Sequence, residues 1–250
     1  TTTPAEIPEK PRDQYSAVTN RWRDAGVAYQ LTQDETLAQW VRQAIVGLAQ
    51  AFPAMPVRQR KVRLSETVSG LYEAMWVVPV LLAYDLTWES PAYSPADHAL
   101  IETQLLRPAA ELFVVPDYSD ATDPRPGDLH YKCYTFEAWF ISVAGLTGLL
   151  LKDPDLVEHA IDGPYGLKHL LAHDIHDDGV FWERSMGYHG FVLYALHPFL
   201  EAAGHCNLDL YRLAVADDYN VDREPLVNYC VGDGDNGPKS LRLFFQGPFF

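Results

Sequence analysis

Apolar side chains recur at three- and four-residue spacing along almost the whole chain, and this pattern limits its fold more than any other feature. In residues 34–52 the positions with this spacing are Leu37, Trp40, Val41, Ala44, Ile45 and Leu48. An α-helix places such positions on one face, so each segment of this kind predicts an amphipathic helix. Further helices are predicted at residues 15–31, 64–84, 94–114, 131–151, 155–161, 166–175 and 185–200.

Strand signals are scarce by comparison. Residues 241–245 form the one convincing short strand candidate, behind a glycine-rich loop at 232–237. Helical hairpins that follow one another at roughly 40 to 60 residues favour antiparallel pairs stacked into an arc or ring. We therefore predict a mainly all-α fold, an incomplete (α/α) toroid of antiparallel helical hairpins over residues 15–230, after an irregular segment at 1–14. Residues 231–250 are predicted to be a loop and short strand that begin a β-rich part.

The composition argues against several classes of protein. The chain has 34 acidic and 19 basic residues, which gives a formal net charge of −15 at pH 7. Such a charge disfavours a nucleic-acid-binding surface or a surface for anionic membranes. No apolar run is long enough to be predicted as a membrane span. The basic run at residues 58–63 is interpreted as a solvated loop, although it would also fit a local basic cleft on an acidic body.

The first residues and the cysteines bear on location. The chain begins at Thr1, and residues 1–12 are rich in proline and charge, so we expect a processed terminus and an exported protein, secreted or periplasmic. Cys133, Cys206 and Cys230 are odd in number and far apart, without a CxxC pair. Neither a disulfide framework nor a cysteine zinc site is indicated, and we expect buried thiols.

Residues 178–189 combine a turn, a set of acid–base side chains and the start of a helix. Asp178 and Gly179 are a turn signal, and the helix predicted to follow them places Tyr188 and His189 in its first turn. The amide dipoles of a helix add positive potential at that end, which eases a phenol toward phenolate. Tyr188 is therefore a candidate base. The alternative is a tyrosine that only fills the core.

Three stretches occur in an order that is similar to a known family. The first joins residues 28–32 (Ala-Tyr-Gln-Leu-Thr) to residues 83–86 (Ala-Tyr-Asp-Leu), the second is residues 139–155 (WFISVAGLTGLLLKDPD), and the third is residues 178–189, with its Asp-Gly, Glu, Ser and Tyr-His order. Together they resemble the helical toroid of the heparinase II/III-like and alginate lyase superfamily of polysaccharide lyases. The likeness covers about residues 20–240, and it implies β-elimination of a uronic-acid polymer without a cofactor.

The reaction implied by the resemblance needs two kinds of group. The C5 proton of a uronate is too weakly acidic for a protein base until the sugar carboxylate is neutralised. The resemblance implies that Tyr188 takes this proton and returns it to the departing O4. In the family an Asn or His at the start of the central helix neutralises the carboxylate, and residues 130–139 contain no Asn. His130 is the predicted neutralising residue, with Lys132 as an alternative and Arg184 as a substitute clamp.

The predicted substrate contacts are the aromatic and polar side chains near these positions: Lys132, Tyr134, Trp139, Trp182, Glu183 and His189. Trp139, Trp182 and Tyr188 are expected to line one cleft, and His130 or Arg184 is expected to lie within a sugar's width of the Tyr188 hydroxyl. The expected partner is an acidic polysaccharide or oligosaccharide, with no nucleic acid and no membrane. The sequence does not indicate an oligomeric state.

Histidines and acids between residues 169 and 178 are the densest set of metal-type ligands. His169 and His173 have the spacing of one helix face, which suits zinc. The segment between them lacks the glutamate of an HExxH motif, and the end of a helix favours histidine without any metal. The loop at 232–237 lacks the spacing and the terminal Glu of a calcium loop. No metal site is predicted.

Two other functions stay open at the level of sequence. A glycoside hydrolase on the same toroid would use paired carboxylates, such as Asp178 with Glu183 or Asp85, and would create no double bond. A noncatalytic sugar-binding domain would only stack its tryptophans and Tyr188 on sugar rings. A Tyr188→Phe variant distinguishes these functions, because only a lyase should lose turnover.

Overall fold

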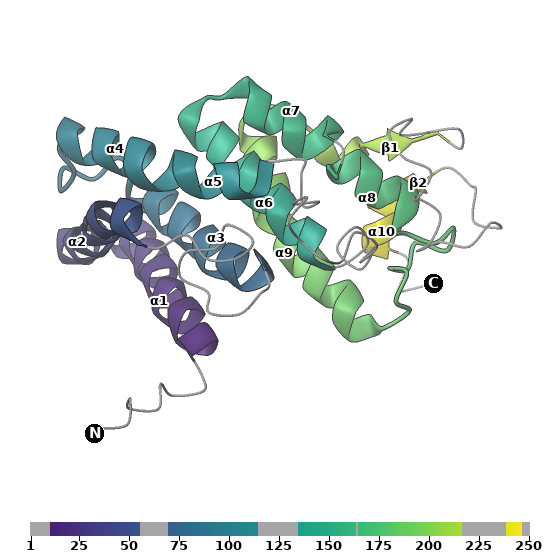
Figure 1. The fold of residues 1–250 in the computed structure, drawn as a ribbon, viewed down its shortest axis with the longest axis horizontal. Helices are drawn as coiled ribbons and strands as arrows, with labels where there is room; N and C mark the ends of the chain where they lie inside the picture. Colours follow the sequence, from purple (N-terminus) through teal and green to yellow (C-terminus); the bar gives the residue numbers. More distant parts are fainter. Residues whose placement is uncertain (1–10, 56–69, 115–134, 164, 217–238, 247–250) are drawn as a thin grey trace, which may run out of the picture. The chain divides into compact units, whose positions relative to one another are not determined.

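The computed structural model describes residues 11–55, 70–114, 135–163, 165–216 and 239–246 of the chain. They belong to two compact units, Thr1–Pro108 and Ala109–Phe250. Helices account for most of the described residues in each unit (Figure 1), so the predicted all-α fold class is confirmed. None of the described helices is long and apolar enough to cross a membrane. The toroid boundaries at residues 15–230 stay a prediction.

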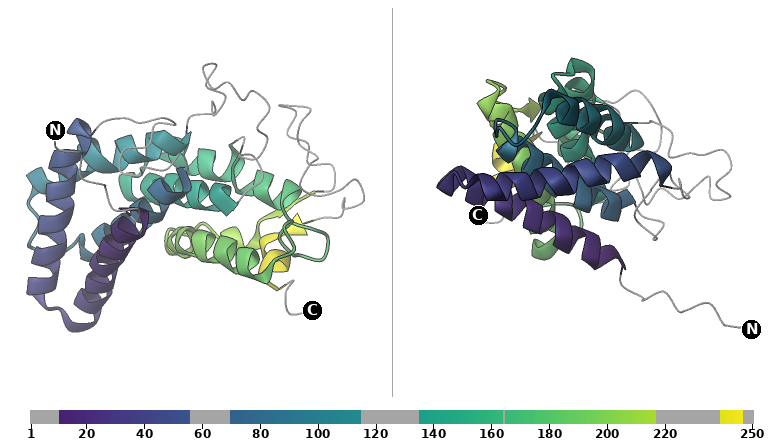
Figure 2. Two further views of the ribbon diagram at one scale, coloured as in Figure 1. Left: turned by 60° about the horizontal axis from the view of Figure 1, so that its bottom comes forward. Right: turned by 90° about the vertical axis from the view of Figure 1, so that its left-hand side faces the viewer.

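In the part of the first unit that the structure describes there are four α-helices and two short turns of other helical types. They are α1 (Pro11–Thr32), α2 (Glu35–Ala51), the 3-10 turn η1 (Phe52–Ala54), α3 (Gly70–Thr87), α4 (Pro95–Ile101) and the π-helical turn η3 (Glu102–Leu106). α1 and α2 form an antiparallel hairpin, which is seen at the lower left of Figure 2. The residues that α2 buries are Ala38, Val41, Ile45 and Ala49, which follow the predicted three- and four-residue spacing.

α3 runs in the same direction as α1, with α2 returning between them in sequence. The C-terminal part of α1 lies against the C-terminal end of α3, where the Gln30 side chain donates a hydrogen bond to the Leu86 carbonyl. A Cβ atom added at Gly26 would lie 3.0 Å from Leu86 Cβ. A small residue at this position therefore lets the two helices approach closely.

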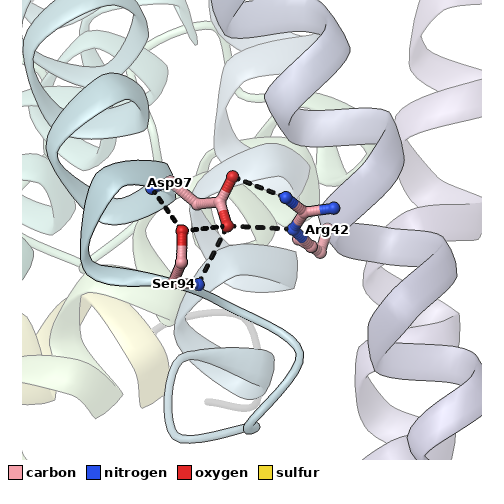
Figure 3. Close-up of polar contacts among 3 residues, drawn as sticks. All are labelled: Arg42, Ser94 and Asp97. Atoms are coloured by element: carbon pink, nitrogen blue, oxygen red, sulfur yellow. Dashed lines mark hydrogen bonds and ion pairs between the residues drawn. The ribbon is translucent and has the colours of Figure 1, made fainter.

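Residues with short polar side chains start several helices. Ser94 caps α4: its hydroxyl accepts the Asp97 N–H, and Asp97 in return accepts the Ser94 N–H at 2.8 Å. Arg42 of α2 adds two hydrogen bonds to the same carboxylate (Figure 3). Asp153 caps the helix that starts at Pro154 in the same way, by accepting two backbone N–H groups. Such caps satisfy amide groups that have no partner inside the helix.

The second unit contains the remaining helices and two very short strands. They are α5 (Arg107–Val114), which begins at the boundary, α6 (Thr135–Leu151), α7 (Pro154–Asp162), α8 (Leu167–His173), α9 (Met186–His205), the 3-10 turn η5 (Leu210–Arg212), β1 (Ala214–Val215), β2 (Lys239–Ser240) and α10 (Leu241–Gln246). α6 is the central helix of this unit, because it is buried on nearly every side and contacts α7, α8 and α9.

α6 and α9 lie side by side in the same direction. Trp139 packs on Phe191 with ring centroids 5.3 Å apart, and the Ser142 hydroxyl donates to the Ala195 carbonyl at 2.5 Å. Further along, a Cβ atom at Gly145 would lie 2.3 Å from a ring carbon of Phe199. The partners advance together along both helices, so the two helices are parallel and both begin at the same end of the pair.

The strand predicted at residues 241–245 is wrong, because this segment is the helix α10. The Ser240 hydroxyl accepts the Leu243 N–H at 3.1 Å and so favours a helical turn. Leu241 and Phe244 are three positions apart and both are completely buried. Only Lys239 and Ser240 are extended, paired with β1 in an antiparallel ladder. A run this short fits both the helical and the strand period, and its contacts with the rest of the unit decide between them.

Candidate active site

A short hairpin precedes α9 and carries part of the predicted site. Ile175 and Phe181 pair across it, and at its tip the Asp178 carboxylate accepts the Val180 N–H at 3.0 Å. Gly179 has a φ of 83°, which a side chain would disfavour. The predicted Asp-Gly turn is confirmed, and the Asp178 carboxylate is engaged in shaping it.

Tyr188 lies in the first turn of α9, as predicted. The helix is capped by Ser185, whose hydroxyl lies 3.4 Å from the Tyr188 N–H and whose carbonyl accepts the His189 N–H at 2.8 Å. The Tyr188 side chain is 50% exposed. A tyrosine that only filled the core would be buried, so the position of Tyr188 suits contact with a ligand better than packing.

Arg184 links the hairpin to the start of α9. Its backbone has a φ of 50°, a left-handed conformation that costs an arginine roughly 1 kcal/mol. The Arg184 N–H donates to the Phe181 carbonyl at 2.8 Å, which closes the turn. Arg184 as a residue is exposed, and its guanidinium makes a part-buried contact of 3.4 Å with Nδ1 of the buried His176. Arg184 and Tyr188 thus flank the cap of one helix, four residues apart.

His189, a predicted substrate contact, lies in the interior and is only 1% exposed. Its Nδ1 accepts the Phe181 N–H at 3.1 Å, so the ring proton belongs on Nε2. The ring packs on Phe244 of α10 at 4.7 Å, and Figure 2 shows α10 against α9. Burial lowers the pKa of His189, and the Phe244 backbone partly opposes this shift. The structure therefore gives His189 the task of holding the hairpin on α9.

The tryptophans and Glu183 differ in how far they reach the surface. Trp139, also a predicted substrate contact, is 3% exposed and lies beneath Phe191 and Tyr194 of α9. Trp182 and Glu183 are half-buried, and burial raises the pKa of Glu183. Trp182 and Glu183 therefore remain close to the surface, whereas Trp139 supports the site from within.

Tyr194 is a candidate residue that the sequence reasoning missed. It lies on α9 six residues after Tyr188 and is 54% exposed, with its ring 5.8 Å from the Trp139 ring. Its polar hydroxyl was the available signal for an amphipathic position at the surface.

The start of α6 belongs to the same end of the helix pair as Tyr188. Because α6 and α9 are parallel and in register, Thr135 at the beginning of α6 lies at the end where α9 begins. His130, Lys132 and Tyr134 come directly before Thr135 in the sequence, but they lie outside the described residues.

A buried acid–base cluster lies at the base of the hairpin, formed by Glu137, His169, His173, Asp174 and Lys239. His169 Nδ1 is 3.6 Å from a Glu137 carboxylate oxygen, and the His169 and His173 rings are 4.7 Å apart. Burial, followed by the charges of His169 and Lys239, lowers the pKa of His173 to about 4. Burial also raises the pKa of Asp174 well above its usual range, and the Glu137 carboxylate adds to this shift.

His169 and His173, the pair that suggested zinc, thus do contact each other. Nonetheless, within the described ranges no group of three or more metal-type side chains is arranged to hold a metal ion. His169 faces the Glu137 carboxylate. His173 is neutral, because burial and the charges of His169 and Lys239 lower its pKa. The cluster is therefore an acid–base network.

Comparison with known proteins points to alginate lyases. The chain is 27% identical over 184 residues to an alginate lyase of Stenotrophomonas maltophilia (strain K279a), which covers 70% of this chain and 23% of the relative. It is 24% identical over 200 residues to an exo-oligoalginate lyase of Saccharophagus degradans, which covers 77% of this chain and 25% of that relative. The chain thus spans about a quarter of the length of these relatives. No family model matches it.

The relatives bear on the resemblance only in part. Their names support a polysaccharide lyase family and the alginate lyase side of the likeness. The heparinase-like side is not confirmed by them.

Proposed function

We propose that this chain forms a catalytic part of a polysaccharide lyase that cleaves a uronic-acid-containing polysaccharide by β-elimination and leaves unsaturated uronyl ends. One observation carries the proposal: the exposed Tyr188 lies at the end of the parallel helix pair where α6 also begins. The similarity to two alginate lyases supports the choice of reaction and of a uronate substrate.

Tyr188 is the proposed base. It lies in the first turn of α9, a helix of 20 residues, where unpaired N–H groups create positive potential. This potential attracts the carboxylate of a uronate. After taking the C5 proton, the tyrosine hydroxyl is able to return it to O4 as the bond to the leaving sugar breaks.

The sugar carboxylate needs a partner that neutralises it as the charge develops. We propose His130 for this role, because it precedes α6 by a few residues and α6 begins at the Tyr188 end of the pair. Lys132 is the alternative on the same segment. Arg184 is the candidate within the described residues, because it is an exposed residue four positions before Tyr188 and a guanidinium is suited to a bidentate grip.

An aromatic surface on α9 suits the faces of pyranose rings. Tyr188 and Tyr194 are both half-exposed on this helix, and the buried Trp139 supports Tyr194 from below. Six residues of helix correspond to about 9 Å along the axis and about 120° around it, so the two tyrosines would contact different sugar residues of a polymer. We propose that Trp182, Glu183 and Tyr134 complete the contacts near the reacting sugar. An acidic polysaccharide outside the cell, and hence a secreted or periplasmic enzyme, is the setting that this function implies.

A glycoside hydrolase is the second candidate, because Glu183 is half-buried and its pKa is raised by burial, as a general acid requires. Its predicted partner Asp178 already accepts the Val180 N–H, and Asp85 belongs to the first unit. The noncatalytic alternative would keep the aromatic surface and need no base.

Tyr188→Phe tests the proposal, with Tyr194→Phe as the matched control on the same helix. On a panel of uronate polymers followed by the absorbance of the unsaturated product, we expect Tyr188→Phe to lower kcat by at least roughly a hundredfold with little change in affinity. Tyr194→Phe keeps its ring and should retain activity within a few-fold. Neutral glucans should not be cleaved. Reducing ends released from a uronate polymer without the unsaturated product would reject elimination and favour the hydrolase.

A further inference from the structure

The hairpin that leads to Tyr188 contains a buried histidine, His176, which contacts the side chain of Arg184. His176 is only 7% exposed. Its backbone is fixed within the hairpin, because its N–H donates to the Val180 carbonyl at 2.9 Å and its carbonyl accepts the Gly179 N–H at 2.8 Å. Nη2 of Arg184 lies 3.4 Å from Nδ1 of the ring. The ring therefore lies at a fixed position next to the guanidinium.

The two contacts of the His176 ring determine which of its nitrogens carries the proton. Nε2 lies 3.3 Å from the Trp182 carbonyl, and a carbonyl oxygen only accepts, so Nε2 must be the donor. A guanidinium only donates, so Nδ1 must present its lone pair to Arg184. Together the contacts require the neutral ring with its proton on Nε2, because a proton on Nδ1 would point at the N–H groups of the guanidinium.

A neutral partner holds the guanidinium without cancelling its charge. Among the described residues the Arg184 side chain contacts the His176 ring and forms no ion pair. A carboxylate in the place of the imidazole would neutralise Arg184 and compete with the carboxylate of a substrate. The positive charge of Arg184 thus remains available to an anion at the start of α9.

The backbone of Arg184 supports a role for its side chain. Its left-handed φ of 50° is a strain that glycine would avoid, and residues strained in this way cluster at functional sites. Ser185, the next residue, caps α9, and Tyr188 follows in the first turn. The guanidinium is thus held near the proposed base, at the helix end that already favours anions.

We propose that His176 is a positioning residue of the candidate site: its neutral ring holds the Arg184 guanidinium in place to bind the carboxylate of a uronate. This inference rests on the proposed function where it concerns the substrate. The contact between the ring and the guanidinium is a property of the fold and is testable without any substrate.

Nitrogen NMR of the protein labelled with 15N-histidine tests the contact without substrate. At mildly alkaline pH the His176 ring should show a protonated Nε2 and an unprotonated Nδ1. Arg184→Ala should shift the Nδ1 resonance of His176 and leave unchanged the resonances of His205, an exposed histidine at the end of α9. A protonated Nδ1, or a His176 resonance that Arg184→Ala leaves unchanged, overturns the contact.

Two variants separate the contact with Arg184 from the contact with Trp182. In His176→Asn the amide oxygen takes the place of Nδ1 and still accepts from Arg184, whereas the donor to the Trp182 carbonyl is lost. In His176→Gln the amide nitrogen takes the place of Nε2 and still donates to that carbonyl, whereas the acceptor for Arg184 is lost. A merely structural role, through the Trp182 contact, would make His176→Asn the worse variant.

Binding of a uronate oligosaccharide tests the role toward substrate, in a Tyr188→Phe background that prevents turnover. His176→Gln should weaken the affinity roughly tenfold, because the guanidinium is no longer held in place, and His176→Asn should stay within a few-fold. When Arg184→Ala is also present, His176→Gln should cause no further loss. Equal losses in His176→Gln and His176→Asn, or an undiminished loss in the Arg184→Ala background, overturn the positioning role.

This inference and the proposed function fail separately. A protein that binds uronate through Arg184 but forms no unsaturated product retains the role of His176 and loses β-elimination. A protein whose His176→Gln variant forms that product at the wild-type rate retains the proposed function and overturns the inference. If His176→Gln does not fold, the wild-type ring spectrum and Arg184→Ala decide: unchanged affinity for uronate in Arg184→Ala overturns the inference.

Discussion

The two compact units use the same helical arrangement but treat a buried carboxyl group in opposite ways. Each unit contains a parallel pair of neighbouring helices: α1 with α3, separated in sequence by α2, and α6 with α9, separated by α7 and α8. In the first unit the carboxylate of Asp97 receives two hydrogen bonds from Arg42 and two from Ser94, and the Arg42 contact is the main reason that its pKa falls to about 2. In the second unit Asp174 is completely buried, and burial is the main reason that its pKa is raised.

This difference distinguishes Asp97, a carboxyl group that supports the fold, from Asp174, a carboxyl group that lies near the candidate site. Asp97 is charged, paired and part of a helix cap, so it stabilises the fold at neutral pH. Asp174 is costly to ionise where it lies, and such carboxyl groups are common near functional sites. Their pH linkage has opposite signs. Asp97 stabilises above its unfolded pKa and loses this contribution as the pH falls, whereas the contribution of Asp174 is largest at low pH and declines as the pH rises toward its raised pKa.

The largest difference in stability between the two units is expected from substitution of the glycines where the parallel helices meet. Gly145→Ala should destabilise the second unit by about 3 kcal/mol, because the new Cβ would lie 2.3 Å from the buried ring of Phe199. Gly26→Ala should cost about 1 kcal/mol or less, because its nearest atom, at 3.0 Å, is on the side chain of Leu86. Urea unfolding followed by circular dichroism measures both. Equal costs would show that the two helix pairs are packed alike.

An intermediate effect on stability is expected when the pH is lowered. Protonation of Asp97 between about pH 4 and pH 2 should remove about 2 kcal/mol of stability, since its pKa falls from 3.8 to about 2 on folding. Asp97→Asn should be less stable than wild type at pH 7, and the gap should close as the pH falls through this window. A gap that stays constant with pH would mean that the Arg42 contact contributes no net stability.

The smallest effect is expected from Gly47→Ala in α2, where a Cβ atom would have no neighbour within 4 Å. Alanine is a better helix former than glycine, so the first unit should gain about 0.5 to 1 kcal/mol. Thermal unfolding measures this gain, with Gly145→Ala as the contrasting variant. A loss of stability at Gly47 would show that this face of α2 is covered in solution.

Local signals in the sequence predicted the helices and several of their boundaries. The caps at Ser94 and Asp153 and the turn at Asp178 and Gly179 each depend on one side chain and its nearest backbone groups, so a sequence is enough to predict them. The segment at 241–245 was misjudged, because a run of five residues fits two periods.

The candidate site was predictable only in its local part. The sequence placed Tyr188 in the first turn of a helix, and the structure agrees. Periodicity tells which face of a helix is apolar but not what covers it, so the burial of Trp139 and the exposure of Tyr194 did not follow from it. Cys206 was expected to be buried, yet it lies exposed just after α9. The contact between Glu137 and His169 joins distant segments, which no local pattern indicates.

The parallel pairing of α6 and α9 also bears on the order of events in folding. Ser142 and Ala195 are 53 residues apart in the sequence, and α7 and α8 form between them from contacts that are much more local. Long-range contacts of this kind require the chain between them to be closed, which costs conformational entropy before any contact stabilises the fold. We therefore expect α6 and α9 to dock after the intervening helices. A defect at their interface should then speed unfolding and leave refolding almost unchanged. The interface that sets the position of Tyr188 would thus control how long the native state persists.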